Sequence, residues 1–179
     1  MPALRRVDGV DVLYETGSGG DGPGDEPVTD EPAVLLVCAG AFGELGVAAA
    51  QRLARQGIAV TVVDPRWVLP VPDAIVELAR GHRLVVAVSD GGRHGGFGSA
   101  VAQRLRESEC DVPVRDLAIP QRFLEHGSRD DVLAALGLTA QGVARRVTEW
   151  AAALLGTPSC AEGQAPSRDA TAAPGEQGR

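Results

Sequence analysis

Lysine and asparagine are both missing from this sequence, so all 17 of its basic residues are arginines. A phosphate-binding loop of the GxxxxGK[ST] type requires a lysine and therefore cannot occur. Aromatic residues are also scarce, at 3% of the chain, whereas hydrophobic residues make up 44%. The chain can therefore bury a core, but that core must be built from valine, leucine, alanine and isoleucine.

Positive charge is in short supply, because the formal net charge is -7. Proteins that bind nucleic acids normally present a basic face, so the composition argues against a nucleic-acid partner. Only three cysteines occur, at Cys38, Cys110 and Cys160, and they form no CxxC pair. Widely spaced cysteines in odd number are typical of reduced cytosolic thiols rather than of disulfides or a zinc site.

Long hydrophobic runs are absent as well. A helix that crosses a bilayer needs about 20 apolar residues in succession, and no segment approaches that length. Residues 1–6 lead into no apolar stretch of the kind that marks a signal peptide. We therefore predict a cytoplasmic protein without a membrane partner.

The chain does contain a regular alternation of strand-like and helix-like segments. Its 179 residues suit a single domain. Strands are expected at 34–38, 58–63, 84–88 and 112–117, with a short edge strand at 10–13, and helices at 42–56, 73–80, 98–106, 128–136 and 139–155. This order predicts an α/β fold with three layers, in which helices cover both faces of a mostly parallel sheet.

Two segments lack this periodicity. Residues 15–32 are rich in glycine, proline, aspartate and glutamate and are predicted to form a flexible acidic loop. Residues 156–179 consist largely of alanine, glycine, proline, serine and charged residues, and we expect this tail to be disordered.

A glycine-rich turn joins the strand at 84–88 to the next helix, in the sequence LVVAVSDGGRHGGFGSAV at 84–101. Gly95 and Gly96 permit a positive φ or a close backbone approach, and Gly98 lets the helix pack tightly on the sheet. Because helix N-termini attract anions, a small-anion site over 95–99 is one interpretation. A tight turn without a ligand is the other, since GGxG is a far weaker signal than a complete GxGxxG.

Several side chains follow the carboxyl ends of the expected parallel strands, where functional groups of such sheets gather. They are Phe42, Arg66, Trp67, Asp90, His94, Phe97, Arg122 and Phe123. Aromatic residues and arginines are enriched at the centres of protein interfaces. We therefore predict association through this rim, with Arg66 and Trp67 as the main anchors, although some of the aromatic rings can equally fill the core.

The individual polar residues of the rim have alternative interpretations. Arg66 is expected to pair with Asp64 or Asp90 or to reach a neighbouring domain. His94 is either a solvated loop histidine or a group that titrates near neutral pH. His126 precedes a glycine and a helix-capping serine, which favours a packed turn residue.

Three blocks carry a resemblance to a known family. They read VTVVDPRWV at 60–68, GGFGSAV at 95–101 and IPQRFLEHGS at 119–128. In this order they resemble the C-terminal, transketolase-type domain of actinobacterial 1-deoxy-D-xylulose-5-phosphate synthases. The resemblance covers nearly all of residues 2–150 except the acidic loop. Residues 1–14 then correspond to the linker that enters the domain, and 33–155 to the domain itself.

The resemblance implies a transferase that joins pyruvate-derived carbons to glyceraldehyde 3-phosphate for isoprenoid and thiamine synthesis, using thiamine diphosphate and Mg²⁺. In that family the diphosphate and the metal bind in the first domain, and the activating glutamate lies in the second. Gly20-Asp21-Gly22 lies in the acidic loop, and a GDG…N metal motif is incomplete without asparagine. We therefore expect no catalytic, cofactor-binding or metal residue in this chain, and cofactors only through a partner chain.

Two features depart from the family pattern: Ser89-Asp90 stands where the family has an acidic pair, and Leu69 stands where it has a lysine. Three hypotheses remain open. The chain is a C-terminal domain or accessory subunit of such a synthase, a module that binds a small anion, or a non-catalytic stand-alone remnant. The expected partners are a second copy of the chain or a chain that carries the two missing domains.

Overall fold

A computed structural model describes residues 2–16 and 34–155 of the chain. The predicted disordered tail at 156–179 lies outside the described residues, as does the predicted acidic loop at 15–32 apart from its first two residues.

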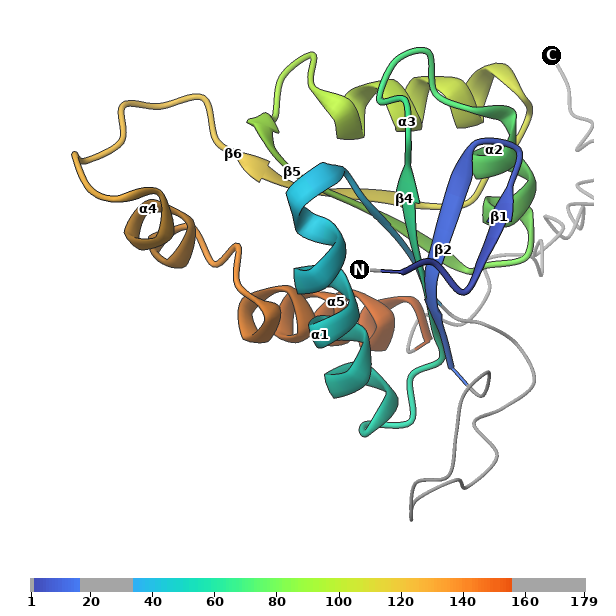
Figure 1. Cartoon of the computed structure of the whole chain (residues 1–179), viewed down its shortest axis with the longest axis horizontal. Helices are drawn as coiled ribbons and strands as arrows, with labels where there is room; N and C mark the ends of the chain where they lie inside the picture. The colour runs from blue at the N-terminus through green and yellow to red at the C-terminus, as the bar shows by residue number, and fades with distance from the viewer. Residues whose placement is uncertain (1, 17–33, 156–179) are drawn as a thin grey trace, which may run out of the picture.

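The centre of the fold is a six-stranded sheet with the order β1-β2-β4-β3-β5-β6 (Figure 1). The strands are β1 (Arg5–Val7), β2 (Val10–Glu15), β3 (Val34–Cys38), β4 (Val60–Pro65), β5 (Leu84–Gly92) and β6 (Val114–Ile119). The strands β4, β3, β5 and β6 are parallel, whereas β1 and β2 pair antiparallel to their neighbours. The predicted α/β fold with a mostly parallel sheet is confirmed.

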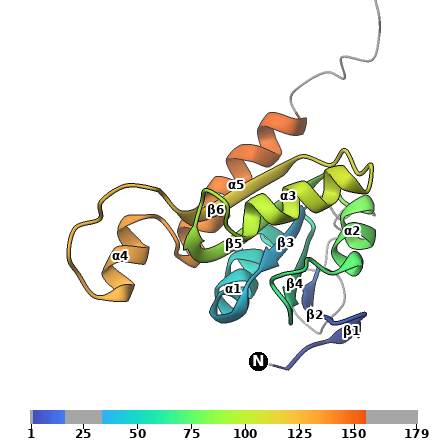
Figure 2. The ribbon, with the colours of Figure 1, turned by 90° about the horizontal axis from the view of Figure 1, so that it is seen from above.

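Helices cover both faces of the sheet, as the three-layer prediction requires (Figure 2). They are α1 (Gly43–Ala54), α2 (Asp73–Arg80), α3 (Phe97–Glu107), α4 (Arg129–Ala135) and α5 (Ala140–Leu155), with a 3₁₀ turn η1 (Gly40–Phe42) before α1. On one face α1 and α5 pack on residues such as Leu36, and on the other α2 and α3 pack on residues such as Leu35. All five residues of β3 are buried because both of its faces are covered.

Local sequence explains several helix boundaries. The hydroxyl of Ser128 accepts the N–H of Asp131 at 3.2 Å and so caps α4, and the hydroxyl of Thr139 accepts the N–H of Gly142 at 3.1 Å at the start of α5. Gly46 brings α1 against β3, because a Cβ there would overlap the sulfur of Cys38.

The N-terminal segment differs from its prediction. The short edge strand expected at 10–13 is β2, which is longer and lies inside the sheet, between β1 and β4. The turn at Asp8 and Gly9, with φ of 40° and 83°, folds β1 back on β2 as a hairpin. Val10 and Val12 are fully buried, so this hairpin belongs to the core and is more than a linker.

The glycine-rich turn also begins later than expected. Strand β5 continues through Ser89, Asp90 and Gly91, and Gly92 pairs with Ile119 after a shift in register. This irregularity lengthens β5 by four residues beyond the predicted end at 88. It moves Asp90 from a turn to an exposed strand position.

Candidate functional site

The loops that follow β3, β4, β5 and β6 lie at the carboxyl ends of the four parallel strands. We call these loops, together with the last four residues of β5, the rim; it comprises η1 and residues 66–72, 89–96 and 120–128. Five of the six exposed large apolar side chains in the described part of the chain belong to it: Trp67, Val68, Leu69, Phe123 and Leu124. The sixth is Leu4, which directly precedes β1 and lies outside the rim. Apolar groups are thus concentrated in two of the four rim loops.

The loop after β4 is attached to the N-terminal hairpin. The N–H of Arg66 donates to the carbonyl of Gly9 at 3.2 Å, and the Arg66 guanidinium lies 3.7 Å from the carboxylate of Asp11. The prediction that Arg66 pairs with Asp64 or Asp90 is therefore wrong. Arg6 binds the same carboxylate and, through that hydrogen bond above all, holds the pKa of Asp11 below its usual value.

Trp67 projects from this loop without being covered. Its exposed fraction is 72%, and Val68 and Leu69 beside it are 41% and 62% exposed. Three consecutive apolar side chains in water give up the favourable free energy of burial, which amounts to about 1.5–3 kcal/mol for each large one. Exposed apolar runs of this kind are typical of surfaces that bind other proteins.

Asp64, at the end of β4, lies behind this loop. It accepts the N–H of Gly40 at 3.2 Å, and burial raises the pKa of its carboxyl, an effect that the Gly40 hydrogen bond opposes. Asp64 therefore connects the end of β4 to the start of η1. Its partner is a backbone group, which marks a structural role in fixing the base of the rim.

Glycine occupies three positions at the start of α3 for different physical reasons. Gly95 has a φ of +67°, a conformation that favours glycine. Gly96 is extended, but a Cβ there would overlap the carbonyl oxygen of Gly92. Gly98 faces Asp116 of β6, whose Cβ would lie 2.8 Å from a Cβ on Gly98. The two close approaches satisfy the tight-turn interpretation without a ligand.

The first turn of α3 already faces a negative group. The carboxylate of Asp116 lies against Gly98, and its Oδ1 is buried without a hydrogen-bond partner. Burial raises the pKa of Asp116, while the charge of Arg93 lowers it. A second anion at this helix end would meet that carboxylate, so the geometry does not favour the small-anion interpretation.

The aromatic residues predicted for the rim separate into two groups. Phe42 and Phe97 are buried, with exposed fractions of 2% and 6%, and belong to the two core clusters. Phe123 is fully exposed. Arg122 and His126 in the same loop are exposed as well. The expectation that His126 is a packed turn residue is therefore wrong. His94 is an exposed loop residue.

The loop from Pro120 to Ser128, which we call the arch, leaves the body of the molecule between β6 and α4 (Figure 1). Every residue from 121 to 130 is exposed. A groove of about 420 Å³ lies between the arch and α4. Arg129, the first residue of α4, binds Asp90 at 2.9 Å and lies over the ring of Phe42 at 5.8 Å, which connects the far end of the arch to the body.

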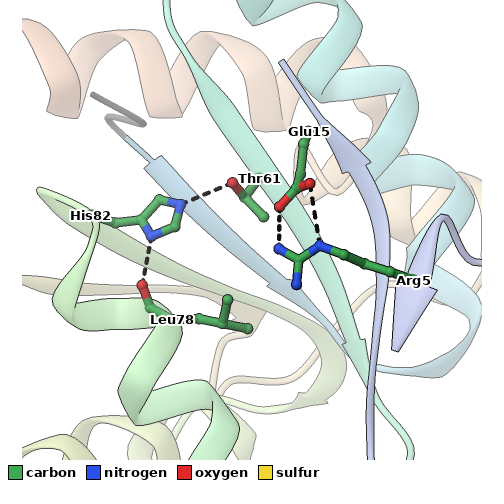
Figure 3. A network of polar contacts seen from close by, with 5 residues as sticks. All are labelled: Arg5, Glu15, Thr61, Leu78 and His82. Carbon is green, nitrogen blue, oxygen red and sulfur yellow. Dashed lines mark hydrogen bonds and ion pairs between the residues drawn. The ribbon is translucent and has the colours of Figure 1, made fainter. Parts of the chain in front are cut away.

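His82 is a buried titratable residue that the sequence pattern did not single out (Figure 3). Its Nδ1 donates to the carbonyl of Leu78 at 2.7 Å, and its Nε2 accepts from the hydroxyl of Thr61 at 2.9 Å. Burial lowers the pKa of His82, so the neutral imidazole joins the end of α2 to β4. His82 stands just before the amino end of β5, whereas the rim lies at the carboxyl ends of the parallel strands, and it has a structural role.

No three His, Cys, Asp or Glu side chains within residues 2–16 and 34–155 gather in a way that would hold a metal ion. None of the helices in the same part of the chain is long and apolar enough to span a membrane.

Comparison with known proteins gives a family match over most of this chain. The model of the family described as "Transketolase, C-terminal domain" matches residues 26–143. This range includes β3 to β6 and the rim. The resemblance found in the sequence is thus confirmed at the level of the domain.

Curated relatives agree with the family. The 1-deoxy-D-xylulose-5-phosphate synthase of Saccharopolyspora erythraea is 57% identical over 87% of this chain and 23% of its own length. A protein of the same name from Mycobacterium sp. (strain KMS) is 50% identical over 90% of this chain and 24% of its own. The chain thus spans about a quarter of the length of the curated relatives it matches, at their C-terminal portion.

A solved structure titled "Split gene transketolase, inactive beta4 tetramer" has the same fold. It is 28% identical, with a TM-score of 0.64, over 82% of this chain and 43% of its own.

Proposed function

This chain belongs to the transketolase C-terminal domain family, and we propose that it acts as the C-terminal domain or accessory subunit of a 1-deoxy-D-xylulose-5-phosphate synthase. Its role is to support assembly of the enzyme, while a separate chain carries thiamine diphosphate and Mg²⁺. The assembled enzyme would join pyruvate-derived carbons to glyceraldehyde 3-phosphate. Relatives of that name at 50–57% identity support the reaction class.

The exposed apolar run Trp67-Val68-Leu69 is the observation that carries this proposal. It follows directly from β4 and is fixed by the bonds of Arg66 to the hairpin, so it is presented in one place. A large aromatic side chain beside an arginine is the usual composition of an interface centre. The cofactor-bearing chain is the partner that we assign to this loop.

The similar structure whose title names a split-gene transketolase supports a two-chain arrangement. That protein is described as a split-gene transketolase and as an inactive β4 tetramer. By analogy, a chain that spans about a quarter of its relatives' length can act together with a second chain that supplies the rest.

The test is a binding assay between this chain and a separate polypeptide that contains the preceding three quarters or so of the Saccharopolyspora erythraea relative. Titration calorimetry should show saturable binding. Arg66→Ala and Trp67→Ala should each weaken it by about tenfold or more, with unchanged circular dichroism spectra. Leu4→Ala, a substitution of an exposed apolar residue outside the rim, is the matched control and should bind normally.

Activity gives a second readout. The purified chain should neither bind thiamine diphosphate in the presence of Mg²⁺ nor make the deoxyxylulose phosphate product, whereas the mixture with the cofactor-bearing chain should do both. Mg²⁺-dependent binding of thiamine diphosphate to this chain alone would contradict the division of labour. Absence of any binding between the two chains would instead favour a stand-alone remnant.

A further inference from the structure

Strand β6 forms one edge of the sheet, because β5 is the only strand beside it. The strand at the opposite edge, β1, has three residues, whereas β6 has six. Backbone groups of an edge strand can pair with a strand of another molecule, and a very short edge strand limits this risk. The longer β6 edge is therefore the one that needs other means to prevent such pairing.

The direction of the backbone groups in β6 shows which of them face away from β5. The carbonyl of Pro113 accepts the N–H of Val85 at 2.9 Å and so faces β5. Because successive residues of a strand present their N–H and C=O groups to opposite sides, those of Val114 and Asp116 face outward. Neither outward N–H has an acceptor within residues 2–16 and 34–155. The edge thus has open donors at both positions.

The two outward carbonyls are both occupied by arginine side chains. Nη2 of Arg93 donates to the carbonyl of Asp116 at 3.2 Å, and Nη1 of Arg115 donates to the carbonyl of Val114 at 3.1 Å. The main chain of Arg93 is fixed as well, because its N–H donates to the carbonyl of Ile119 at 2.8 Å. A strand that paired with β6 would need these same carbonyls as acceptors, so it would have to displace two guanidinium groups.

The side chain of Asp116 places a further charge on this strand, on the face that α3 covers. It lies against Gly98, and among the described residues its buried Oδ1 has no hydrogen-bond partner. A buried carboxylate oxygen without a partner costs free energy, so packing within the domain does not account for an aspartate here. Inward-pointing charges do, however, discourage the pairing of an edge strand with another molecule.

The composition of β6 shows why its edge needs protection. The strand reads VRDLAI, in which Arg115 and Asp116 are the only charged residues. Short apolar segments of high β propensity associate into intermolecular sheets unless charged residues interrupt them. Lysine is the usual protecting residue of an edge strand, and this chain has none. Arginine has to take that role.

We propose that Arg93, Arg115 and Asp116 protect the β6 edge against strand pairing with other molecules. The two arginines do so by occupying the outward carbonyls, and Asp116 does so by its inward charge. Arginine suits this task because its guanidinium both carries charge and donates hydrogen bonds in a fixed geometry. The inference does not depend on the proposed function, since it concerns β6 and leaves residues 66–70 to the cofactor-bearing chain.

The first test measures β-rich aggregation of the full chain at high micromolar concentration, by thioflavin T fluorescence and by the loss of soluble protein on centrifugation. The wild type should stay soluble, whereas the double variant Arg93→Ala/Arg115→Ala should form β-rich aggregates. The matched control, Arg145→Ala/Arg146→Ala, removes two exposed arginines from α5 and should behave like the wild type. Both double variants change the net charge equally, so net charge cannot explain a difference between them.

The second test separates edge pairing from aggregation through unfolding. Hydrogen exchange followed residue by residue should show that the N–H groups of Val114 and Asp116 exchange rapidly in the soluble wild type. In aggregates of the double alanine variant these two groups should become protected, while the amides of β3 stay protected throughout. Arg93→Ala/Arg115→Lys should aggregate less than the double alanine variant, because it restores a charge at the edge.

Three results would overturn the inference. The double alanine variant would remain as soluble as the α5 control, or its aggregates would leave the N–H groups of Val114 and Asp116 exchanging as in the soluble wild type. The third result is aggregation of the lysine variant to the same extent as the double alanine variant.

Discussion

Gly98 of α3 and Asp116 of β6 touch so closely that a Cβ on the glycine would lie 2.8 Å from the Cβ of the aspartate. Rotation of the carboxylate cannot relieve this contact, because the Asp116 Cβ is fixed by the strand. We expect Gly98→Ala to reduce the free energy of unfolding by about 1–3 kcal/mol, as overpacking does. Urea unfolding followed by circular dichroism measures the change.

The same substitution in an Asp116→Ala background gives the control for this prediction. Removing the carboxylate takes away the nearest atoms, so Gly98→Ala should then cost less than in the wild type. Equal costs in the two backgrounds would show that α3 does not depend on this contact.

The turn before α3 should tolerate alanine at Gly92 but not at Gly96. A Cβ on Gly96 would overlap the backbone oxygen of Gly92, whereas a Cβ on Gly92 would meet no atom within 4 Å. Because the obstacle at Gly96 is backbone, relief requires the turn to move, and we expect a loss of about 1–3 kcal/mol for Gly96→Ala and a larger loss for Gly96→Val. Thermal unfolding compares the variants; similar melting temperatures for Gly92→Ala and Gly96→Ala would contradict the assignment.

Stability should fall as the pH drops below about 6.5, because of His82. Burial lowers the pKa of this imidazole below its ordinary value of 6.5, outweighing the hydrogen bond to Leu78 and the charge of Glu15. The unfolded chain then binds a proton at a pH where the folded chain does not, so the contribution of His82 is complete above pH 6.5 and declines toward its folded pKa. Urea unfolding at several pH values between these limits measures the slope.

His82→Gln provides the comparison for that slope, since glutamine does not titrate. The difference in unfolding free energy between wild type and variant should shrink as the pH falls. Asp64 and Asp116, which are partly buried, act in the opposite direction at lower pH because their pKa values are raised, and their contributions cancel in the difference. If the difference in unfolding free energy between wild type and variant did not change with pH, residues other than His82 would be responsible for the acid sensitivity.

Arg129 should control how firmly the arch is held. Its ion pair with Asp90 and its position over Phe42 are both partly solvated, so Arg129→Ala should cost only about 0.5–1.5 kcal/mol of global stability. Hydrogen exchange in residues 121–128 should nevertheless become faster. Arg145→Ala, which removes an exposed pair with Glu149 on α5, should leave exchange in the arch unchanged.

The sequence predicted the parts of the fold that depend on local patterns. Apolar runs such as 34–38 located the parallel strands, and Ser128 and Thr139 marked helix starts that their hydroxyls indeed cap. The hairpin role of β1 and β2 was missed because its pairing with β4 joins segments about 50 residues apart, which short-range periodicity does not report. The extension of β5 was missed because Ser89 to Gly92 have low strand propensity.

Candidate site residues were harder to place, for a related reason. Residue type identified Phe42, Phe97 and Phe123 as aromatic groups near strand ends, but only Phe123 is exposed. Phe42 and Phe97 are buried by tertiary packing in the core clusters on the two faces of the sheet, which residue type does not report. The polar partners Asp11, Asp116 and Arg129 come from elements distant in sequence from the residues they contact. One signal in the sequence could have pointed to Asp116. This residue lies two positions after Val114, on the same face of β6, where an apolar residue is normally found.

The N-terminal hairpin limits how far this domain can be shortened from its N-terminus. The family match begins at residue 26, yet β2 supplies the fully buried Val10 and Val12 and covers β4 on the side away from β3. A shorter polypeptide that starts at residue 26 would turn β4 into an uncovered edge, with unpaired backbone groups beside a hydrophobic surface. Uncovered apolar edges recruit further strands from other molecules, so aggregation is the expected fate of the shortened domain.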